Sequence, residues 1–374
     1  MDYIDSPPIS ATQASAIVTE YLLQRLQVYR ELCDIRTEHW GSEEGDAWFQ
    51  KQRQQADNAD DRTKRGFFGI MRSIGLELNA ATSGLTINRA HKPHHAILDL
   101  CMAPGGFSAA ALHRNPAAIV RGISLPPGRG GHDMLLKNWS DIHPDAKIFV
   151  DFRDITLLAE EMGVPLRSIP PEHPDAQLFS SDRPFHSEGK FDLVFCDGQV
   201  LRTQERGEHR QYNESSRLLT SQLVLALQRI RSGGTMVVLM HRADTWRSVK
   251  LIHTFSRFSE RVQLHKPLRA HQIRSSFYMV AQGVRPGTEM AIEAVKEWKE
   301  QWREATFQPA GDADGTEKGE HMVGCGDNTE REINAVLDNF GITFIGMVES
   351  VFKTQTMALR NAPWAKKSNS KGCQ

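Results

Sequence analysis

A glycine turn follows a short apolar run in the first third of the chain, within "LDLCMAPGGFS" at residues 98–108. Gly105 and Gly106 lack a Cβ, so a ligand can approach their backbone closely. The small-residue helix expected after them offers free N–H groups, which favour an anionic group. Neither the phosphate-loop pattern G-x-x-x-x-G-K-[ST] nor the dinucleotide pattern G-x-G-x-x-G occurs in the chain. The turn therefore predicts a nucleotide-like ligand, and a merely structural turn is the alternative for this motif alone.

Histidines and cysteines give little sign of metal chemistry. His91, His94 and His95 lie together in "HKPHHA", but no carboxylate or thiolate lies near them in the sequence, so a loop without a metal is favoured. No Ser-His-Asp arrangement is recognisable. The five cysteines lie far apart and form no CxxC pattern, which indicates reduced thiols: Cys33, Cys101, Cys196, Cys325 and Cys373. The sequence predicts no metal site.

The composition is that of an ordinary soluble globular protein, with 374 residues, of which 40% are hydrophobic and 24% charged. A formal net charge of −1 argues against a chain that coats nucleic acid through bulk charge. A local basic excess lies between Arg242 and Arg274, with eight Lys or Arg against Asp244 and Glu260. This excess fits either a nucleic-acid face or a solvated face. No apolar run reaches about eighteen residues and no signal-like start occurs, so we expect an intracellular protein, cytoplasmic or nuclear, without a membrane segment.

The elements that must position the turn alternate between short apolar runs and helix-like segments. Such alternation indicates βαβ units and an α/β fold with a doubly wound, mostly parallel sheet. The ligand site is then expected beyond the carboxyl ends of the strands. The expected strands lie at residues 96–101, 118–125, 147–152, 191–198, 233–240, 261–266 and 275–282.

Helical extensions are expected on both sides of this sheet. Ser10 and Gln13 form a capping box ahead of an amphipathic N-terminal helix. In the tail, two more helices are expected after a polar gap. The first of these begins with a box at Thr329 and Glu332 and ends at Gly341, a residue type suited to a left-handed C-cap. The stripe on the preceding tail helix indicates core packing through Ala291, Val295, Trp298 and Trp302.

The order of the motifs resembles that of the FtsJ-like methyltransferases, S-adenosylmethionine-dependent enzymes that methylate ribose 2′-hydroxyls of RNA. "LDLCMAPGGFS" is similar to that family's motif I, and "VDFRDI" at 150–155 to its segment after the third strand. "FDLVFCDG" at 191–198, "SGGTMVVLM" at 232–240 and "HKPLRAHQIRSSFYMVAQGV" at 265–284 resemble the motifs that follow. The overall layout is similar to that of fungal proteins carrying this domain.

This resemblance implies a Rossmann-like class I methyltransferase fold, S-adenosyl-L-methionine as cofactor and RNA as partner. RNA methylation, with rRNA processing as its setting, is the implied role. We therefore expect an N-terminal helical extension at 1–61, an FtsJ-like S-adenosylmethionine-dependent methyltransferase domain at 62–285 and a C-terminal helical extension at 286–374. The sequence indicates no oligomeric state.

The resemblance also implies a set of cofactor-binding residues. Asp151 would reach the adenine amino group with Phe152 nearby, and Asp197 would lie at the cofactor's amino group and the reacting centre. Ser124 stands where an acid normally grips the ribose hydroxyls, so a hydroxyl replaces a carboxylate. The residues implied to surround the methionine part are Asp99, Ala103, Pro104, Gly105, Gly106 and Phe107.

The family's catalytic set of lysine, aspartate, lysine and glutamate is only partly matched. Asp197 is present, whereas the second lysine falls at Leu239 and the glutamate at Ser276 or Phe277. On the helix before motif I, where the first lysine belongs, the candidates are Gly69, Arg72 and, earlier, Lys64.

A substitute set is conceivable. Alternation along a strand places His241 on the same face as Leu239, so its imidazole could act as base, with Arg242 supplying positive charge. Lys250 and Lys266 are weaker candidates. An RNA ribose methyltransferase with an altered catalytic set is the leading hypothesis. A catalytically inactive cofactor- or RNA-binding protein and a small-molecule methyltransferase are the alternatives.

Overall fold

Seven strands form one sheet in the computed structural model, which describes residues 9–40, 43–57, 61–88, 94–136, 147–201, 204, 206–307 and 329–365. The strand order is β3-β2-β1-β4-β5-β7-β6, and β7 runs antiparallel to both of its neighbours. Every apolar run predicted to be a strand forms one, and the mostly parallel, doubly wound sheet is confirmed. The strands are β1 Ala96–Leu100, β2 Ile119–Ser124, β3 Lys147–Phe152, β4 Phe191–Cys196, β5 Ile230–His241, β6 Arg261–His265 and β7 Ser276–Val284.

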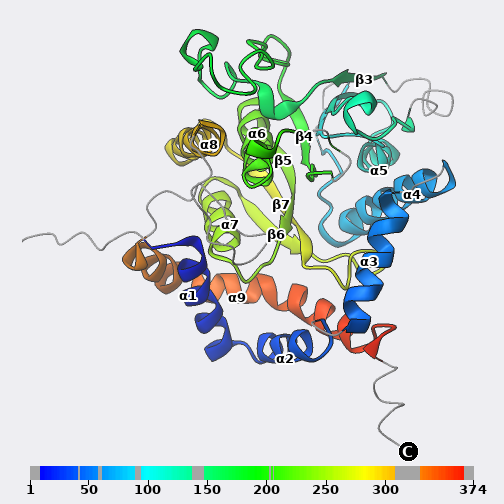
Figure 1. The fold of residues 1–374 in the computed structure, drawn as a ribbon, viewed down its shortest axis with the longest axis vertical. Coiled ribbons are helices and arrows are strands. Elements are labelled where there is room, and N and C mark those ends of the chain that lie inside the picture. The colour runs from blue at the N-terminus through cyan, green and yellow to red at the C-terminus, as the bar shows by residue number, and fades with distance from the viewer. Residues whose placement is uncertain are drawn as a thin grey trace, which may run out of the picture.

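Helices cover both faces of the sheet (Figure 1). Side chains alternate along each strand, so that Ile97 packs on the face of α4 and α5 while Leu98 joins the core on the face of α6 and α7. A π-helical segment lies at η1 Arg36–Trp40, and short 3-10 helices lie at η2 Pro127–Arg129, η4 Ile155–Leu157, η5 Leu166–Ser168 and η6 Glu208–Arg210. The helices are α1 Ala11–Arg25, α2 Gln27–Ile35, α3 Glu43–Asp57, α4 Asp61–Thr82, α5 Gly106–Arg114, α6 Glu214–Arg229, α7 Trp246–Phe258, α8 Glu289–Phe307 and α9 Glu330–Arg360.

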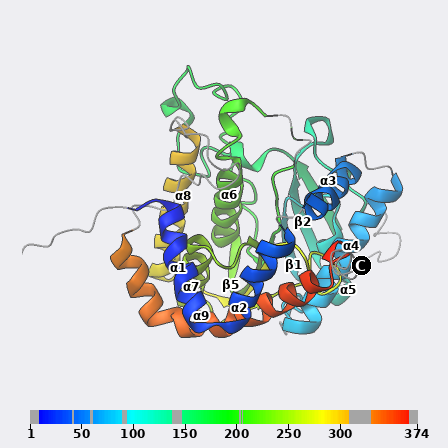
Figure 2. The ribbon, with the colours of Figure 1, turned by 60° about the horizontal axis from the view of Figure 1, so that its bottom comes forward.

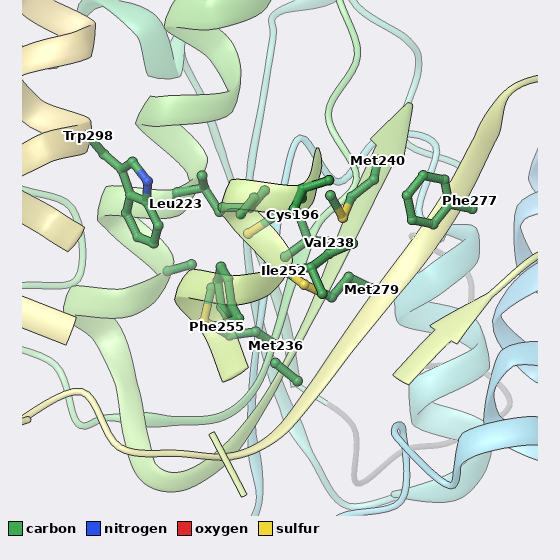
Figure 3. Packing of buried hydrophobic residues seen from close by; sticks show 14 of the residues in the cluster. Cys196, Leu223, Met236, Val238, Met240, Ile252, Phe255, Phe277, Met279 and Trp298 are labelled. Atoms are coloured by element: carbon green, nitrogen blue, oxygen red, sulfur yellow. The ribbon is translucent and has the colours of Figure 1, made fainter. Parts of the chain in front are cut away.

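The larger core lies between the sheet and helices α6, α7 and α8. Figure 3 shows Met236, Val238 and Met279 of the sheet packed with side chains of these helices. Trp298 of α8 stacks on Phe255 of α7, with ring centroids 5.9 Å apart. The predicted inward stripe on α8 is confirmed, since Ala291, Trp298 and Trp302 are buried and Val295 is partly buried against them.

The first helix of the chain and the last one lie together on this side of the molecule, where α2 runs alongside α9 (Figure 1, Figure 2). Both predicted capping boxes begin helices: Ser10 accepts a hydrogen bond from the Gln13 backbone N–H, and Thr329 accepts one from that of Glu332. The N-terminal helix is broken once, at Leu26, which has extended backbone angles.

The prediction that a helix ends at Gly341 is wrong, because α9 continues through this residue and extends over 31 residues as one helix. A Cβ at Gly341 would lie 2.3 Å from the hydroxyl oxygen of Tyr21 on α1. The glycine therefore allows the close approach of another helix rather than a left-handed helix end.

Helix α9 is, within the described parts of the chain, the one helix that is long and apolar enough to cross a membrane. Its buried residues pack on the fold: Ile333, Leu337, Phe344, Val348, Val351 and Phe352 belong to the larger core, and the helix contacts α1, α2, α7 and β6. In this structure α9 is a core helix of the folded chain.

Candidate functional site

The carboxyl ends of four neighbouring strands bring the predicted cofactor residues to one edge of the sheet. Leu100 of β1 pairs with Ile123 of β2 on one side and with Cys196 of β4 on the other. Ile123 in turn pairs with Asp151 of β3. The glycine turn, Asp151 and the residue after Cys196, Asp197, therefore share this edge, as a ligand between them requires.

The glycine turn uses its two glycines in different ways. Gly105 precedes α5 with a φ of 101°, a conformation that disfavours any side chain. A Cβ at Gly106 would lie 2.5 Å from the Cβ of Met71 and 2.8 Å from the backbone nitrogen of Arg72. Gly106 therefore lets α4 pack closely on the start of α5, and it places the candidate Arg72 beside the turn.

Residues 131–136, here called the covering segment, lie over the turn. A Cβ at Gly105 would meet the Cβ of Leu136 at 2.8 Å and the sulfur of Met134 at 3.3 Å. The Leu135 N–H donates to the carbonyl of Pro104 over 3.1 Å. The candidate Lys64 forms an ion pair of 2.8 Å with Asp133 of the segment. The backbone of Gly105 is thus in contact with protein side chains in this structure.

Asp99 lies beneath the turn rather than at its surface. The side chain is 2% exposed and accepts a hydrogen bond of 2.5 Å from the Ser108 hydroxyl in the first turn of α5. Burial raises the pKa of Asp99 to about 7, and the hydrogen bonds from Ser108 oppose this shift. Asp99 therefore anchors the helix that follows the turn.

The residues expected at the adenosine lie at the ends of β2 and β3. The Ser124 hydroxyl accepts a hydrogen bond of 3.2 Å from the N–H of Ala103, so it also supports the turn. The Asp151 carboxylate pairs with Arg153 over 2.6 Å and is partly exposed, and the ring of Phe152 is exposed. An exposed ring beside a reachable carboxylate suits a purine with an exocyclic amine.

A buried ionic cluster that the sequence did not reveal holds the segment after β3. Arg210 donates to Glu214 over 2.6 Å and to Asp154, the last residue of "DFRD", over 3.0 Å. Arg217 lies 3.5 Å from Glu214 and 3.7 Å from Asp175. The sequence separations among these residues carry no local signal, apart from the (i, i+4) and (i, i+3) spacings within residues 210–217.

Asp197 is a buried acid at this edge. Its Oδ1 is buried and has no hydrogen-bond partner within the described residues. Burial raises the pKa of Asp197 well above its ordinary value, and the nearby carboxyl of Asp99 raises it further, while the Tyr278 hydroxyl opposes this shift. An unpartnered buried carboxylate oxygen is rare in native proteins and points to a ligand donor.

The residues that stand where the family's second lysine and glutamate are expected lie on the paired strands β5 and β7. Leu239 is 5% exposed and lies directly opposite Tyr278 across the β5–β7 pair. Ser276 pairs with His241 and shares the face of Tyr278, whereas Phe277 belongs to the larger core on the other face. Ser276 is therefore the residue on the site's face of the sheet.

The catalytic candidates at the end of β5 lie in a basic cluster. Desolvation and the cations Arg247, Lys266 and Arg274 lower the pKa of His241 to about 4. Arg242 adopts a φ of 50° and lies 3.6 Å from Asp244. The basic cluster, as the term is used below, consists of His241, Arg247, Lys266, His271 and Arg274.

The two weaker lysine candidates have other partners. Lys250 pairs with Glu297 of α8 over 2.9 Å, on the opposite side of the sheet. The buried Lys266 donates to the carbonyls of His271 and Ser276 over 2.9 and 2.6 Å, and to that of Arg274. These hydrogen bonds fix the loop before β7 to the end of β6. Burial, together with the nearby cations Arg36 and Arg274, lowers the pKa of Lys266 to about 7.

Of the three histidines considered for a metal, the structure describes His94 and His95. His91 lies outside the described residues, and His94 contacts the carbonyl of Ala117 through Nδ1 at 3.3 Å. Across the described stretches, no three His, Cys, Asp or Glu side chains gather in a way that could hold a metal ion.

The residues at this edge fit an adenosyl sulfonium such as S-adenosylmethionine. The buried Oδ1 of Asp197 suits a ligand's ammonium or cationic centre, and the partly exposed Asp151 and Phe152 suit an adenine. The covering segment lies across the remaining side, so the methionine part would meet Met134 and Leu136 next to Gly105.

Comparison with known proteins agrees with this geometry. The model of the FtsJ-like methyltransferase family matches residues 81–284. No curated protein matches the sequence. The solved structures named below, which are three of a larger number, resemble the fold only at low TM-scores, so the family follows from the family model and the strand order.

The first solved structure is a precorrin-6Y C5,15-methyltransferase from Geobacter metallireducens, at 12% identity and TM-score 0.31 over 55% of this chain and 87% of that one. A TehB-like S-adenosylmethionine-dependent methyltransferase from Corynebacterium glutamicum is 15% identical, with a TM-score of 0.30 over 64% of this chain and 97% of that one. An O-methyltransferase family protein from Burkholderia thailandensis is 13% identical, with a TM-score of 0.35 over 72% of this chain and 72% of that one. From the family match and the strand order together, the chain belongs to the FtsJ-like methyltransferase family, as an S-adenosylmethionine-dependent enzyme with a Rossmann-like class I fold.

Proposed function

We propose that this methyltransferase acts on RNA and methylates a ribose 2′-hydroxyl. The observation that carries the proposal is Asp197, whose buried Oδ1 lies unpartnered, among the described residues, at the edge of the sheet where the glycine turn begins. S-adenosylmethionine, when bound, supplies the methyl group. Asp151 and Phe152 would hold its adenine, and Ser124 and the turn from Ala103 to Phe107 would line the rest.

Asp197 would act as the proton acceptor. A ribose hydroxyl ionises only at high pH, so its proton has to leave as the oxygen forms its bond to carbon. In this step the hydroxyl proton passes to Oδ1 of Asp197. The raised pKa of Asp197 makes its ionised form a stronger base than an ordinary carboxylate.

The basic cluster supports RNA as the substrate. Lys266, Arg274 and Arg247 lie close enough to His241 to lower its pKa, and Arg274 and Lys266 do the same to His271. At neutral pH the positive charge of the cluster lies mainly on Arg247 and Arg274, because the pKa values of His241 and His271 are lowered to about 4 and that of Lys266 to about 7. Two such cations attract a polyanion and make its binding salt-dependent. We propose His241 and Arg242 as groups that contact the substrate's phosphate or hydroxyl, and Arg72 as a further cation next to the turn.

Labelled methyl transfer to total RNA, followed by digestion to nucleosides, tests the proposal. We expect the label in 2′-O-methyl nucleosides, and we expect loss of incorporation in Asp197→Asn. Asp338→Asn changes an exposed carboxylate on α9 and is the matched control. Equal incorporation by Asp197→Asn and the natural protein would contradict the assigned role, and label in the bases would contradict ribose specificity.

A second candidate function, binding of cofactor or RNA without transfer, is favoured by one observation. Leu239 places a buried apolar side chain where the family has a lysine. Calorimetric titration with S-adenosylmethionine separates the candidates, since a binding protein would bind it and transfer nothing to RNA. Transfer to a small-molecule extract but not to RNA would instead favour the small-molecule alternative.

A further inference from the structure

We propose that Arg36, in the N-terminal helical extension, is a positioning residue that acts through Asp244 and leaves Arg242 to contact a phosphate of the substrate. Arg36 holds the Asp244 carboxylate, which would otherwise pair closely with Arg242. The inference rests on the proposed function, since RNA supplies the phosphate. It gives the helical extension a part in substrate binding in addition to its packing on the sheet.

Arg242 lies at the edge of the sheet that carries the candidate site. Cys196, the last residue of β4, pairs with Val238, and β5 continues beyond that pair to His241. Because β4 and β5 are parallel, Arg242 lies past the carboxyl end of β4, where Asp197 follows. The Arg242 side chain is 42% exposed, so a phosphate can reach its guanidinium.

The backbone of Arg242 is fixed in an uncommon conformation. Its φ of 50° lies in the left-handed region, which residues with long side chains rarely adopt. Its N–H donates to the carbonyl of Ser275 over 3.2 Å, and its carbonyl accepts hydrogen bonds from the Thr245 N–H over 3.2 Å and the Ser248 hydroxyl over 2.9 Å. Strained backbone that neighbouring contacts hold in place is concentrated at functional sites, which favours a role for Arg242 beyond packing.

Asp244 lies between two arginines and is buried. Its Oδ2 accepts hydrogen bonds from Nη1 of Arg36 over 2.8 Å and from the Tyr29 hydroxyl over 3.1 Å. Its Oδ1 lies 3.6 Å from Nε of Arg242, which is longer than a hydrogen bond. Burial opposes ionisation of Asp244, but Arg36 and Arg242 hold its pKa below the ordinary value. Arg36 is therefore the closer partner of an ionised carboxylate.

Both helical extensions hold Arg36 in place. The residue begins the π-helical segment η1 after α2, and α2 contacts α9. Nη2 of Arg36 donates to Oε1 of Gln355 on α9 over 3.1 Å, and Nε2 of Gln355 donates to the carbonyl of Ile273 over 3.2 Å. These contacts connect the extensions to the loop that carries Arg274 of the basic cluster.

The balance of charge explains how Arg36 affects the substrate. One carboxylate lies between two guanidinium groups, so the three groups together carry a net positive charge. Arg242 is the more exposed of the two cations, at 42% against 17% for Arg36, and it presents this charge to solvent. Without Arg36, the buried Asp244 would draw Arg242 into a close pair, because a buried charge needs a partner. The substrate would then lose a phosphate contact.

Binding of a fluorescein-labelled single-stranded RNA of mixed sequence, measured by anisotropy at several salt concentrations, tests the proposal. Arg36→Gln should weaken binding and reduce the slope of log K against log salt by about 0.7, the value for one phosphate contact to a single strand. Arg36→Lys keeps a cation at Asp244 and should restore the slope. Arg360→Met breaks the exposed ion pair of α9 with Glu31 of α2, and as the matched control it should leave the slope unchanged.

Two further substitutions separate positioning from a general loss of structure. Arg242→Gln should reduce the slope by the same amount, and Arg36→Gln should reduce it no further in the Arg242→Gln background. Asp244→Asn removes the competing carboxylate, so the slope should stay at the natural value or increase. A purely structural ion pair would instead weaken binding in both Arg36→Gln and Asp244→Asn. A further loss in the double variant, or a reduced slope in Asp244→Asn, overturns the proposal, and Asp244→Asn decides it if Arg36→Gln does not fold.

Modification of arginines by phenylglyoxal tests the same competition without RNA. The rate at Arg242, followed by mass spectrometry of peptides, should fall several-fold in Arg36→Gln and rise in Asp244→Asn, because a close carboxylate stabilises the charged, unreactive guanidinium. Equal rates at Arg242 in the natural protein and both variants would contradict the inference.

The outcomes distinguish this inference from the proposed function. Natural protein that binds RNA with the expected slopes but methylates no ribose would contradict the proposed function alone. Natural protein that methylates RNA, with an unchanged slope in Arg36→Gln, would contradict the inference alone. Natural protein that binds no RNA would contradict both.

Discussion

Replacement of Asp99 by asparagine should change how the free energy of unfolding depends on pH. In the folded chain Asp99 is buried with the Ser108 hydroxyl as its donor, and burial raises its pKa from 3.8 to about 7. An unfolded chain exposes the same carboxyl at its ordinary pKa. The folded state therefore binds an additional proton between these two values, and the stability linked to Asp99 is complete below the lower one and is lost as the pH rises through the upper one.

The magnitude follows from the two pKa values. A difference of about three units corresponds to about 4 kcal/mol in the limit of high pH. Between about pH 5 and about pH 8 the loss amounts to about 2–3 kcal/mol, because part of it has already occurred at the lower pH. The asparagine side chain in Asp99→Asn cannot ionise but can still accept the hydrogen bond from Ser108, so the variant lacks this loss.

Urea unfolding of the natural protein and Asp99→Asn, followed by tryptophan fluorescence, measures the effect. The difference in free energy of unfolding between the two proteins removes the contribution of groups that titrate in both. This difference should change in favour of the variant by about 2–3 kcal/mol between about pH 5 and about pH 8. Ser108→Ala removes a donor to the ionised form and should shift the pH window upward. A stability difference that is constant over this pH range would refute the inference that burial keeps Asp99 protonated.

Three further substitutions test the packing around the site and the extensions. Gly105→Ala should lower the thermal midpoint, at a cost of about 1–3 kcal/mol, because its φ of 101° is strained for alanine. Gly341→Ala should lower the midpoint in the natural protein but raise it in a Tyr21→Ala background, where the contact of 2.3 Å is gone and alanine favours the helix. Arg210→Met should cost about 3–5 kcal/mol in urea unfolding because it removes the cation that pairs with the buried carboxylates of Asp154 and Glu214. Arg303→Met breaks an exposed ion pair on α8 instead and should leave stability unchanged within error.

Local features of the sequence predicted the elements well because the relevant forces act between near neighbours. The capping boxes at Ser10 and Thr329 begin helices, since a hydroxyl satisfies an N–H three residues later. The stripe with Trp298 and Trp302 faces the core because apolar residues three or four positions apart lie on one side of a helix. Gly341 shows the limit of such signals: its contact is with Tyr21, more than three hundred residues earlier in the chain.

Which side chains face the site could be predicted less well than the helices and strands, because this depends on strand register and tertiary packing. The alternatives Ser276 and Phe277 could not be separated from the sequence, because a shift of one residue in strand register moves a side chain to the opposite face. The observed pairing with β5 places Ser276 with His241 and sends Phe277 into the larger core. In the same way, nothing near Gly105 in the sequence indicated that Met134 and Leu136 would cover it.

The sequence by itself determined the strands and the mostly parallel sheet, since apolar periodicity is local and the right-handed βαβ connection allows few arrangements. The edge for the ligand followed from the glycine turn, and the places of Asp151 and Asp197 at it followed from the resemblance in motif order. Only the tertiary structure decided which side chains meet there. Met134 and Leu136 cover Gly105, and Arg210 pairs with Asp154, through contacts between distant segments. Strand register and helix packing set these contacts, and both depend on the whole folded chain.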